Sequence, residues 1–344
     1  MTLHVFNPEH DIALAAGTSR FTPPAAALRL RQALASLPQY WAQPDDVVYT
    51  GDEDLAAYTF DRVEPWGWDS SIVRELTVCG VPRQLMPDDA TLEAIRQLSS
   101  RATAVRLLPL LRQQGTIGES WFCSSANEVT HVLNRLSGPF VLKSPWSSSG
   151  RGVRFCQSSK LSPSEAGWLS RVISRQGGIA IEPFYDKQMD FAMEFDAQPD
   201  GRVTYKGLSV FLAAGSAYSA GIIANESWKR HLLERHVSLD VLDSVRRRII
   251  QLLPTLIAGR YQGPFGIDML AAEGCLHPCI ELNLRRTMGH VAIDIAERCP
   301  ALSFPRLMIV GTEGLRISNS VPFTSHNFDN FDNFNNFDNF NNSP

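Results

Sequence analysis

The chain has 344 residues, of which 44% are hydrophobic and 20% charged, a composition typical of globular proteins with a substantial buried core. Its formal net charge is -4 and its pI about 6.1, which excludes the strongly basic field that favours nucleic acid or an anionic membrane as the main partner. The length favours two or three subdomains, and the charge balance favours a small-molecule partner.

No basic leader followed by a long apolar run opens the sequence, and no segment approaches the roughly 20 apolar residues of a membrane span. We therefore expect a cytoplasmic protein that binds neither membrane nor nucleic acid. The six cysteines are scattered, which favours reduced thiols. Cys275, His277 and Cys279 have metal-like spacing, but they lack a second ligand cluster and interrupt a strand pattern, so we interpret the two cysteines as strand thiols.

The first hundred residues have the pattern of a parallel α/β layer, with strand, loop, helix and strand in that order. These segments are predicted at residues 3–6, 7–22, 25–37 and 46–50. Two further helical runs, separated by Gly80-Val81-Pro82, complete this N-terminal domain near residue 100.

The loop after the first predicted strand is a candidate wall of a substrate site, because ligands collect beyond the carboxyl ends of parallel strands. Asn7, His10 and Asp11 lie in this loop and are the predicted substrate contacts. A lone histidine in a loop is more often structural, so that interpretation of His10 stays open. Trp66 and Trp68 are expected in the core.

A helix at residues 103–115, a strand at 121–124 and a helix at 125–136 are predicted next. Lys143 then ends an apolar strand, and a loop of serines and glycines leads into another strand at 153–156. Such a loop lets backbone N–H groups approach phosphate oxygens, and the lysine adds a positive charge. It is not a Walker A or dinucleotide motif, since those open a helix. Alone, it is more typical of a flexible hairpin.

The segment from residue 179 to 195 places Glu182 at the end of a strand, followed by a proline-fixed link and Asp190. An extended link of this kind offers backbone groups to an adenine edge, and a following acid accepts hydrogen bonds from ribose hydroxyls. On these residues alone, an interdomain hinge with solvated acids is the favoured interpretation. A strand at 203–213 and an amphipathic helix at 239–257 are predicted after it.

Three oxygen-bearing side chains converge in the last predicted hairpin. Glu281 and Asn283 share one strand face because the side-chain period is two. A turn at Glu273-Gly274 returns that strand to Asp268. Two carboxylates and an amide suit Mg²⁺, whose remaining ligands are substrate phosphates and water. An acidic residue capping a sheet edge beside a solvated pair is the alternative. Residues 326–344 repeat Phe, Asp and Asn without a core pattern, which predicts a disordered tail.

Taken together and in this order, the segments resemble the ATP-grasp superfamily of ATP-dependent ligases. The resemblance covers residues 100–295 and is carried by GPFVLKSPWSSSGRGV, IAIEPFYDKQMDFAMEF, GIDML and IELNLRR. Its most specific signal is Asp268, followed thirteen positions later by Glu281 and then by Asn283.

The resemblance implies a role for each matched residue. Lys143 looks like the α-phosphate lysine, Glu182 and Phe184 like the adenine edge, and Asp190 like the ribose acceptor. The implied flap over the β- and γ-phosphates comprises Ser147, Ser148, Ser149, Gly150 and Gly152. The implied metal ligands, which the resemblance expects to bind two Mg²⁺ ions, are Asp268, Glu281 and Asn283. Where relatives often have a further phosphate lysine, this chain has Arg101, which exchanges a point charge for a planar guanidinium.

The implied reaction is attack of a substrate carboxylate on the γ-phosphate of ATP, giving an acyl phosphate that an amine or thiol displaces. Arg285 and Arg286 follow the metal strand and are the predicted catalytic cations, with Lys206 as a further candidate. Solvated positions at the start of a loop are the alternative for the two arginines. A kinase of the same fold and a catalytically silent ATP-binding partner protein also remain open, because the sequence does not identify the acceptor.

The expected fold class is α/β, with an N-terminal α/β domain preceding an ATP-grasp fold of two α+β subdomains that clamp the nucleotide. The predicted boundaries are 1–100 for the N-terminal domain, 101–185 for the central subdomain, 186–320 for the C-terminal subdomain and 321–344 for the tail. The carboxylate, the acceptor and the oligomeric state are left open by the sequence.

Overall fold

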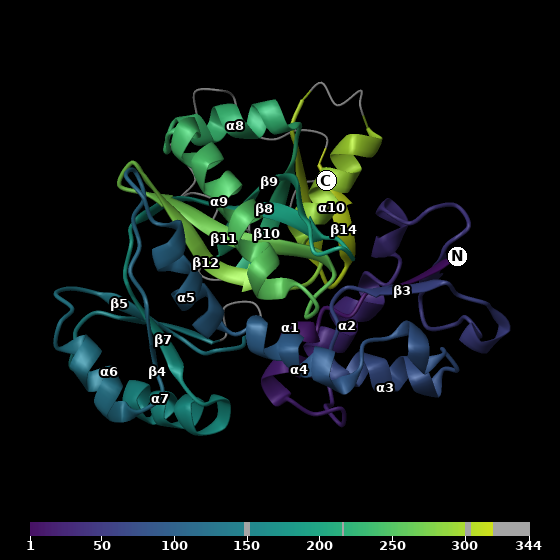
Figure 1. Ribbon diagram of the computed structural model, residues 1–344, viewed down its shortest axis with the longest axis horizontal. Helices are drawn as coiled ribbons and strands as arrows, with labels where there is room; N and C mark the ends of the chain where they lie inside the picture. Colours follow the sequence, from purple (N-terminus) through teal and green to yellow (C-terminus); the bar gives the residue numbers. More distant parts are fainter. Residues whose placement is uncertain (148–151, 215–216, 300–303, 319–344) are drawn as a thin grey trace, which may run out of the picture.

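The computed structural model describes residues 1–147, 152–214, 217–299 and 304–318 (Figure 1). The predicted tail and three flap residues, Ser148, Ser149 and Gly150, lie outside this part of the chain. Within it, the strands form sheets of three, four and seven members, with helices packed on them. The mixed α/β fold class expected from the sequence is confirmed. None of the described helices is both long and apolar enough to cross a bilayer.

The N-terminal domain is built on a parallel sheet in the order β2-β1-β3. Its strands are β1 (Thr2–Val5), β2 (Val47–Tyr49) and β3 (Arg62–Pro65). Its helices are α1 (His10–Ala16), α2 (Ala25–Ala33), α3 (Ser70–Val78) and α4 (Asp89–Leu98), with short 3-10 turns η1 (Leu37–Tyr40), η2 (Leu55–Ala57) and η3 (Arg83–Leu85). Because β1 and β3 are parallel neighbours, the loops that follow them meet at one sheet edge.

Helix α1 lies inside the segment predicted as a loop. It has only seven residues, too few for a periodic apolar pattern to stand out, and Gly17 ends it with a positive φ of 61°. Trp66 is buried with 6% of its surface exposed, as expected of a core residue, and the partly buried Trp68 packs against two core clusters.

The central part contains an antiparallel sheet in the order β4-β7-β5-β6. Its strands are β4 (Trp121–Cys123), β5 (Phe140–Lys143), β6 (Val153–Cys156) and β7 (Ile179–Pro183). Helices α6 (Ala126–Leu133) and α7 (Pro163–Gln176) pack on it, around a core that includes Phe140 and Leu169. Helix α5 (Arg101–Leu111) lies between this sheet and the largest one, because it contacts β4 and β7 as well as β12 (Figure 1).

The largest sheet is antiparallel, in the order β12-β11-β8-β9-β10-β13-β14. Its strands are β8 (Lys187–Ala197), β9 (Val203–Ala214), β10 (Ala217–Ile223), β11 (Gly263–Ala272), β12 (Cys275–Asn283), β13 (Arg306–Gly311) and β14 (Gly314–Ile317). Helices α8 (Glu226–Glu234) and α9 (Leu239–Ile257) pack against it, and α10 (Met288–Arg298) also contacts β8, β9 and β10.

The two faces of this sheet have different side chains because residues alternate along each strand. On β8, Phe191 and Met193 are buried in the core cluster that includes Val245 and Ile249 of α9. Asp190 and Glu194 project to the opposite face, where α10 packs. The acidic face thus lies on the side away from α9.

Candidate nucleotide and metal site

Asp268 and Glu281 are direct cross-strand partners on β11 and β12, and Asn283 pairs with Gly266 on the same face. The turn that joins these strands has positive φ at Glu273 (56°) and Gly274 (72°), as the predicted hairpin requires. Burial, and then the charge of Glu281, raises the pKa of Asp268 to about 7, against the opposing influence of Arg285 and a hydrogen bond from Asn283. The hairpin therefore holds two carboxyl groups so close that a bound cation would stabilise their ionised forms.

Arg101 connects this hairpin to the central sheet. The residue is 6% exposed and begins α5. One guanidinium nitrogen donates to Glu281 Oε2 at 2.8 Å, and the other donates to the Ser144 carbonyl at 2.6 Å and to Ser147 Oγ at 2.8 Å. The fold thus brings together three distant parts of the chain: Arg101, Ser147 of the predicted flap and the predicted metal ligand Glu281.

The flap segment is closely packed where the structure describes it. The Ser144 amide donates to the Gly152 carbonyl at 2.8 Å. A Cβ atom at Gly152 would lie 1.9 Å from Ser144 Oγ and 2.4 Å from Ser147 Cβ, so this position requires glycine. The loop that starts after Lys143 therefore begins and ends at one point beside Arg101.

Lys143 and Glu182 form a buried ion pair on neighbouring strands. The ammonium group donates to Glu182 Oε2 at 2.5 Å, and their side chains are 11% and 7% exposed. The predicted α-phosphate lysine and the predicted adenine-edge glutamate are thus adjacent. Each neutralises the other in this structure, which avoids a buried isolated charge.

His277 on β12 is a polar residue beside this pair that the sequence pattern did not single out for nucleotide contact. Both ring nitrogens are buried and have no hydrogen-bond partner among the described residues. Burial lowers the pKa of His277 to about 4, against the raising effect of the Glu182 charge and with a lowering effect of the Lys143 charge, so the ring is neutral at pH 7. Its ring packs edge-on against Tyr185 at 5.5 Å. Its position between Cys275 and Cys279 was the available signal, but it suggested only a metal-like spacing and no nucleotide contact.

Phe184 and Asp190 lie on either side of the link between the two sheets. The Phe184 amide donates to the Pro139 carbonyl at 3.0 Å, and its ring, 43% exposed, lies edge-on to Phe155. Asp190 forms an ion pair with Lys187. The Phe184 amide is therefore already engaged, and the predicted adenine and ribose roles stay predictions.

The two predicted catalytic arginines point to different surroundings. Arg285 makes a bidentate contact with Asp11, at 3.0 and 2.9 Å, and donates to Asn283 Oδ1 at 3.2 Å. Burial alone would raise the pKa of Asp11, but Arg285 and then His10 hold it below its usual value. Arg285 thus joins a predicted substrate residue to a predicted metal ligand.

Arg286 faces another part of the molecule. It donates to Asp294 at 2.6 Å and lies 4.3 Å above the Trp41 ring. It also lines a cavity of about 420 Å³ whose lining does not include Asp268, Glu281 or Asn283. Lys206 acts electrostatically on Asp294 as well. The structure therefore brings Arg285, but not these two cations, into contact with the metal strand, and their catalytic role stays a prediction.

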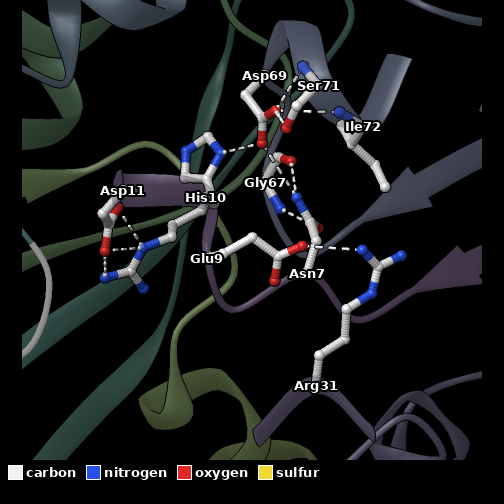
Figure 2. Close-up of polar contacts among 10 residues, drawn as sticks. Asn7, Glu9, His10, Asp11, Arg31, Gly67, Asp69, Ser71 and Ile72 are labelled. Atoms are coloured by element: carbon white, nitrogen blue, oxygen red, sulfur yellow. Dashed lines mark hydrogen bonds and ion pairs between the residues drawn. The ribbon is translucent and has the colours of Figure 1, made fainter. Parts of the chain in front are cut away.

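The two loops at the edge of the N-terminal sheet are joined by buried polar contacts (Figure 2). Asn7 donates to the Gly67 carbonyl at 2.9 Å and to Asp69 Oδ2 at 3.2 Å. His10 Nδ1 lies 3.3 Å from the same Asp69 oxygen. The sequence did not point to Asp69, because β3 was not predicted and the residue has the ordinary features of a helix N-cap.

The donor set on the hairpin fits magnesium. Two carboxylates and one amide oxygen are hard ligands that leave coordination positions for phosphate and water. Within the described ranges, no group of three His, Cys, Asp or Glu side chains is arranged to hold a metal, so a protein-only cage is not found there. Cys275, His277 and Cys279 are not among such groups.

Neither a protein-family model nor a curated protein sequence matches the chain, but solved structures do. One is the biotin carboxylase of Campylobacter jejuni in a β,γ-ATP complex, with 14% identity, a TM-score of 0.50 and coverage of 90% of this chain and 75% of that one. Another is the N5-carboxyaminoimidazole synthetase of Staphylococcus aureus with ADP, at 10% identity, TM-score 0.48 and coverages of 90% and 81%. The similarity to biotin carboxylase shows that the chain has the ATP-grasp fold.

Proposed function

We propose that this protein is an ATP- and magnesium-dependent ligase that activates a small-molecule carboxylate as an acyl phosphate and joins it to an amine or thiol, forming ADP and phosphate. The observation that carries the proposal is the pairing of Asp268 with Glu281 beside Arg101, on the fold of a carboxylase solved with an ATP ligand. This arrangement supplies both the anionic ligands and the cations that phosphoryl transfer needs.

Asp268, Glu281 and Asn283 would hold magnesium, which neutralises charge on the β- and γ-phosphates when it is bound. Arg101 would then exchange part of its contact with Glu281 for a phosphate oxygen, because its guanidinium already reaches both Glu281 and Ser147. Its planar donors suit two oxygens at once. The chain thus provides a cation at the point where flap and metal strand meet.

Lys143 and Glu182 would bind the nucleotide next to this point. The lysine can donate to phosphate without leaving the carboxylate, since an ammonium group has three donors. His277 lies next to them with two unsatisfied ring nitrogens, which makes it a further candidate for the base or ribose. The phosphates would then lie between Lys143 and the backbone of the flap.

Arg285 would orient the substrate carboxylate or the transferring phosphate. Its guanidinium is held by Asp11 on one side and Asn283 on the other, so its direction is fixed before substrate binds. A positioned cation of this kind stabilises negative charge developing in the transition state more than a mobile one does. The substrate would therefore lie between the metal strand and the loop that contains Asp11.

The proposal is tested by measuring ADP release over a panel of carboxylates paired with amines and thiols, with products identified by mass spectrometry. We expect ADP formation that depends on a carboxylate, and a loss of at least about a hundredfold in Glu281→Gln, because a metal ligand is lost while the shape is kept. Glu234→Gln is the matched control, since Glu234 is exposed on α8. Equal ADP formation by wild type and Glu281→Gln would contradict the proposal.

A further inference from the structure

A buried histidine–aspartate pair lies where the segments after β1 and β3 meet (Figure 2). His10 is 1% exposed and Asp69 2% exposed, and they lie 3.3 Å apart. They come from different loops, His10 from the segment after β1 and Asp69 from the segment after β3. Burying polar side chains costs free energy unless they are hydrogen-bonded, so the hydrogen bonds of this pair determine how both side chains are oriented.

The hydrogen bonds of Asp69 define which ring nitrogen of His10 carries a proton. Asp69 Oδ1 accepts from the amides of Ser71 and Ile72, at 2.8 and 3.0 Å. Burial alone would raise the pKa of Asp69, but the hydrogen bonds that it accepts from His10, the Ser71 hydroxyl and the Ile72 amide hold it below its usual value. An ionised carboxylate only accepts hydrogen bonds, so His10 Nδ1 is the donor. In the neutral ring, Nε2 is then left with a free lone pair.

The ring of His10 is held in one plane. A Cβ atom at Gly67 would lie 2.6 Å from His10 Cγ, so the absence of a side chain there lets the ring pack on the backbone. Asn7 fixes Gly67 by binding both its carbonyl and its amide. Glu9, between Asn7 and His10, is held by Arg31 at 2.8 Å. These contacts hold the segment from Asn7 to His10 in place, and none of them involves His10 Nε2.

The loop that contains His10 is joined to one of the predicted metal ligands. Asp11, the residue after His10, is bound by Arg285, which in turn contacts Asn283. The positive charges of Arg285 and Arg101 both stabilise the ionised form of Asp11. In Figure 2, His10 Nε2 points away from Asp69 on the side where Asp11 lies.

We propose that His10 is the general base that takes the proton from an acceptor amine, and that Asp69 positions it. This inference rests on the proposed ligase function and assigns an amine as the acceptor class. As the amine nitrogen bonds to the carbonyl carbon of the acyl phosphate, the carbon–oxygen bond to phosphate breaks and phosphate leaves with that electron pair. His10 Nε2 takes one proton from the nitrogen, and the resulting imidazolium is stabilised by Asp69.

The kinetic test compares two acceptors for the carboxylate found in the screen. Hydroxylamine is uncharged at neutral pH and depends little on a base, whereas an alkylamine must lose a proton before it attacks. In His10→Gln we expect the alkylamine reaction to fall at least about tenfold more than the hydroxylamine reaction, within the range of general-base effects. Raising the pH should recover the alkylamine reaction. Asp69→Asn should show the same selectivity, since an amide no longer fixes the Nδ1–H tautomer.

His231→Gln is the matched control, because His231 is exposed on α8. Equal losses with both acceptors in His10→Gln, or no loss with the alkylamine, would overturn the role of His10. If wild type forms no hydroxamate with any carboxylate, the ligase function itself is overturned, so the two failures are distinguishable.

A second measurement needs no substrate. Nitrogen NMR of histidine-labelled protein reports which ring nitrogen is protonated, and the His10 signals are those missing from His10→Gln. We expect a protonated Nδ1 and an unprotonated Nε2 at neutral pH. A protonated Nε2 with a bare Nδ1 would exclude His10 as the base, whatever the reaction.

Discussion

Asp268 and Glu281 concentrate negative charge at one point of the β11–β12 hairpin, and Arg101 and Arg285 surround it. Without a bound cation, the ionised form of Asp268 is disfavoured, since burial raises the pKa of Asp268 to about 7. Binding a cation there would favour the ionised form and so lower that pKa. In the function that we propose, a metal ion and a phosphate would complete this site.

The raised pKa predicts how stability depends on pH. A carboxyl with a pKa of about 7 in the folded chain binds its proton more tightly than in the unfolded chain, where the pKa is about 4. Its contribution to stability is present below about pH 4 and is lost as pH rises through about 7. In metal-free wild type, we expect Asp268 to lower the free energy of unfolding by up to about 4 kcal/mol across this window.

Urea denaturation at a series of pH values in the presence of a chelator measures this slope. Asp268→Asn should remove the share due to Asp268 and leave the share due to Glu194, whose pKa burial raises to about 8. Asp45→Asn is the control, since Asp45 is exposed and the charge change is the same. An unchanged slope in Asp268→Asn would show that the carboxyl is ionised throughout the window.

Residue identities at the candidate site were partly predictable. The spacing of Asp268, Glu281 and Asn283 placed them on one hairpin face because strand periodicity is local. The contact of Arg101 with Glu281 joins residues 180 positions apart and depends on how α5 packs, which no local pattern encodes. Asp69 was missed for the same reason, since its partner His10 lies on another loop.

At the level of elements, α10 closes one end of the acidic face. Its second residue, Gly289, lies directly against Glu194 and Ser209 of β8 and β9. The capping box of Thr287 and His290 begins the helix at this point. The close approach of the helix to the sheet is therefore possible only because Gly289 has no side chain.

Gly289→Ala should destabilise the protein by about 3 kcal/mol, because its methyl group would lie 2.0 Å from Glu194 Oε1 and 2.5 Å from Ser209 Oγ. Gly167→Ala in α7 is the matched control. The nearest atom to its methyl group would be 3.6 Å away, so better helix propensity should give about 0.5–1 kcal/mol of stabilisation. Chemical denaturation measures both, and a stabilised Gly289→Ala would mean that α10 does not pack this closely.

Several elements with local patterns were predicted, such as the strand β5 and the helix α9, whereas α1, β3 and α7 were not. The strand β5, for example, is a clear apolar run at Phe140–Lys143. The short α1 and the strand β3 have no such pattern: β3 contains Arg62 and Glu64, and is a strand because it pairs with β1. Tertiary pairing, not propensity, determines it.

For the whole molecule, the candidate site lies where three parts of the chain meet. The central sheet contributes Lys143 and the nearby Ser147, the large sheet contributes the hairpin with the predicted metal ligands, and the loop after β1 contributes Asp11 and His10. Contacts such as Asp11 with Arg285 cross between these parts. The order of the motifs along the chain predicted the family fold, while the way in which the parts converge required the structure.

Tracing heavy oxygen from the substrate carboxylate is the most direct measurement of acyl phosphate formation. The carboxylate that supports ADP release is labelled with the heavy isotope and the reaction is run with ATP, magnesium and an amine. Attack of a carboxylate oxygen on the γ-phosphate predicts that one labelled oxygen is recovered in the inorganic phosphate. Phosphate without label, or a phosphate group retained on the final product, would contradict the ligase mechanism.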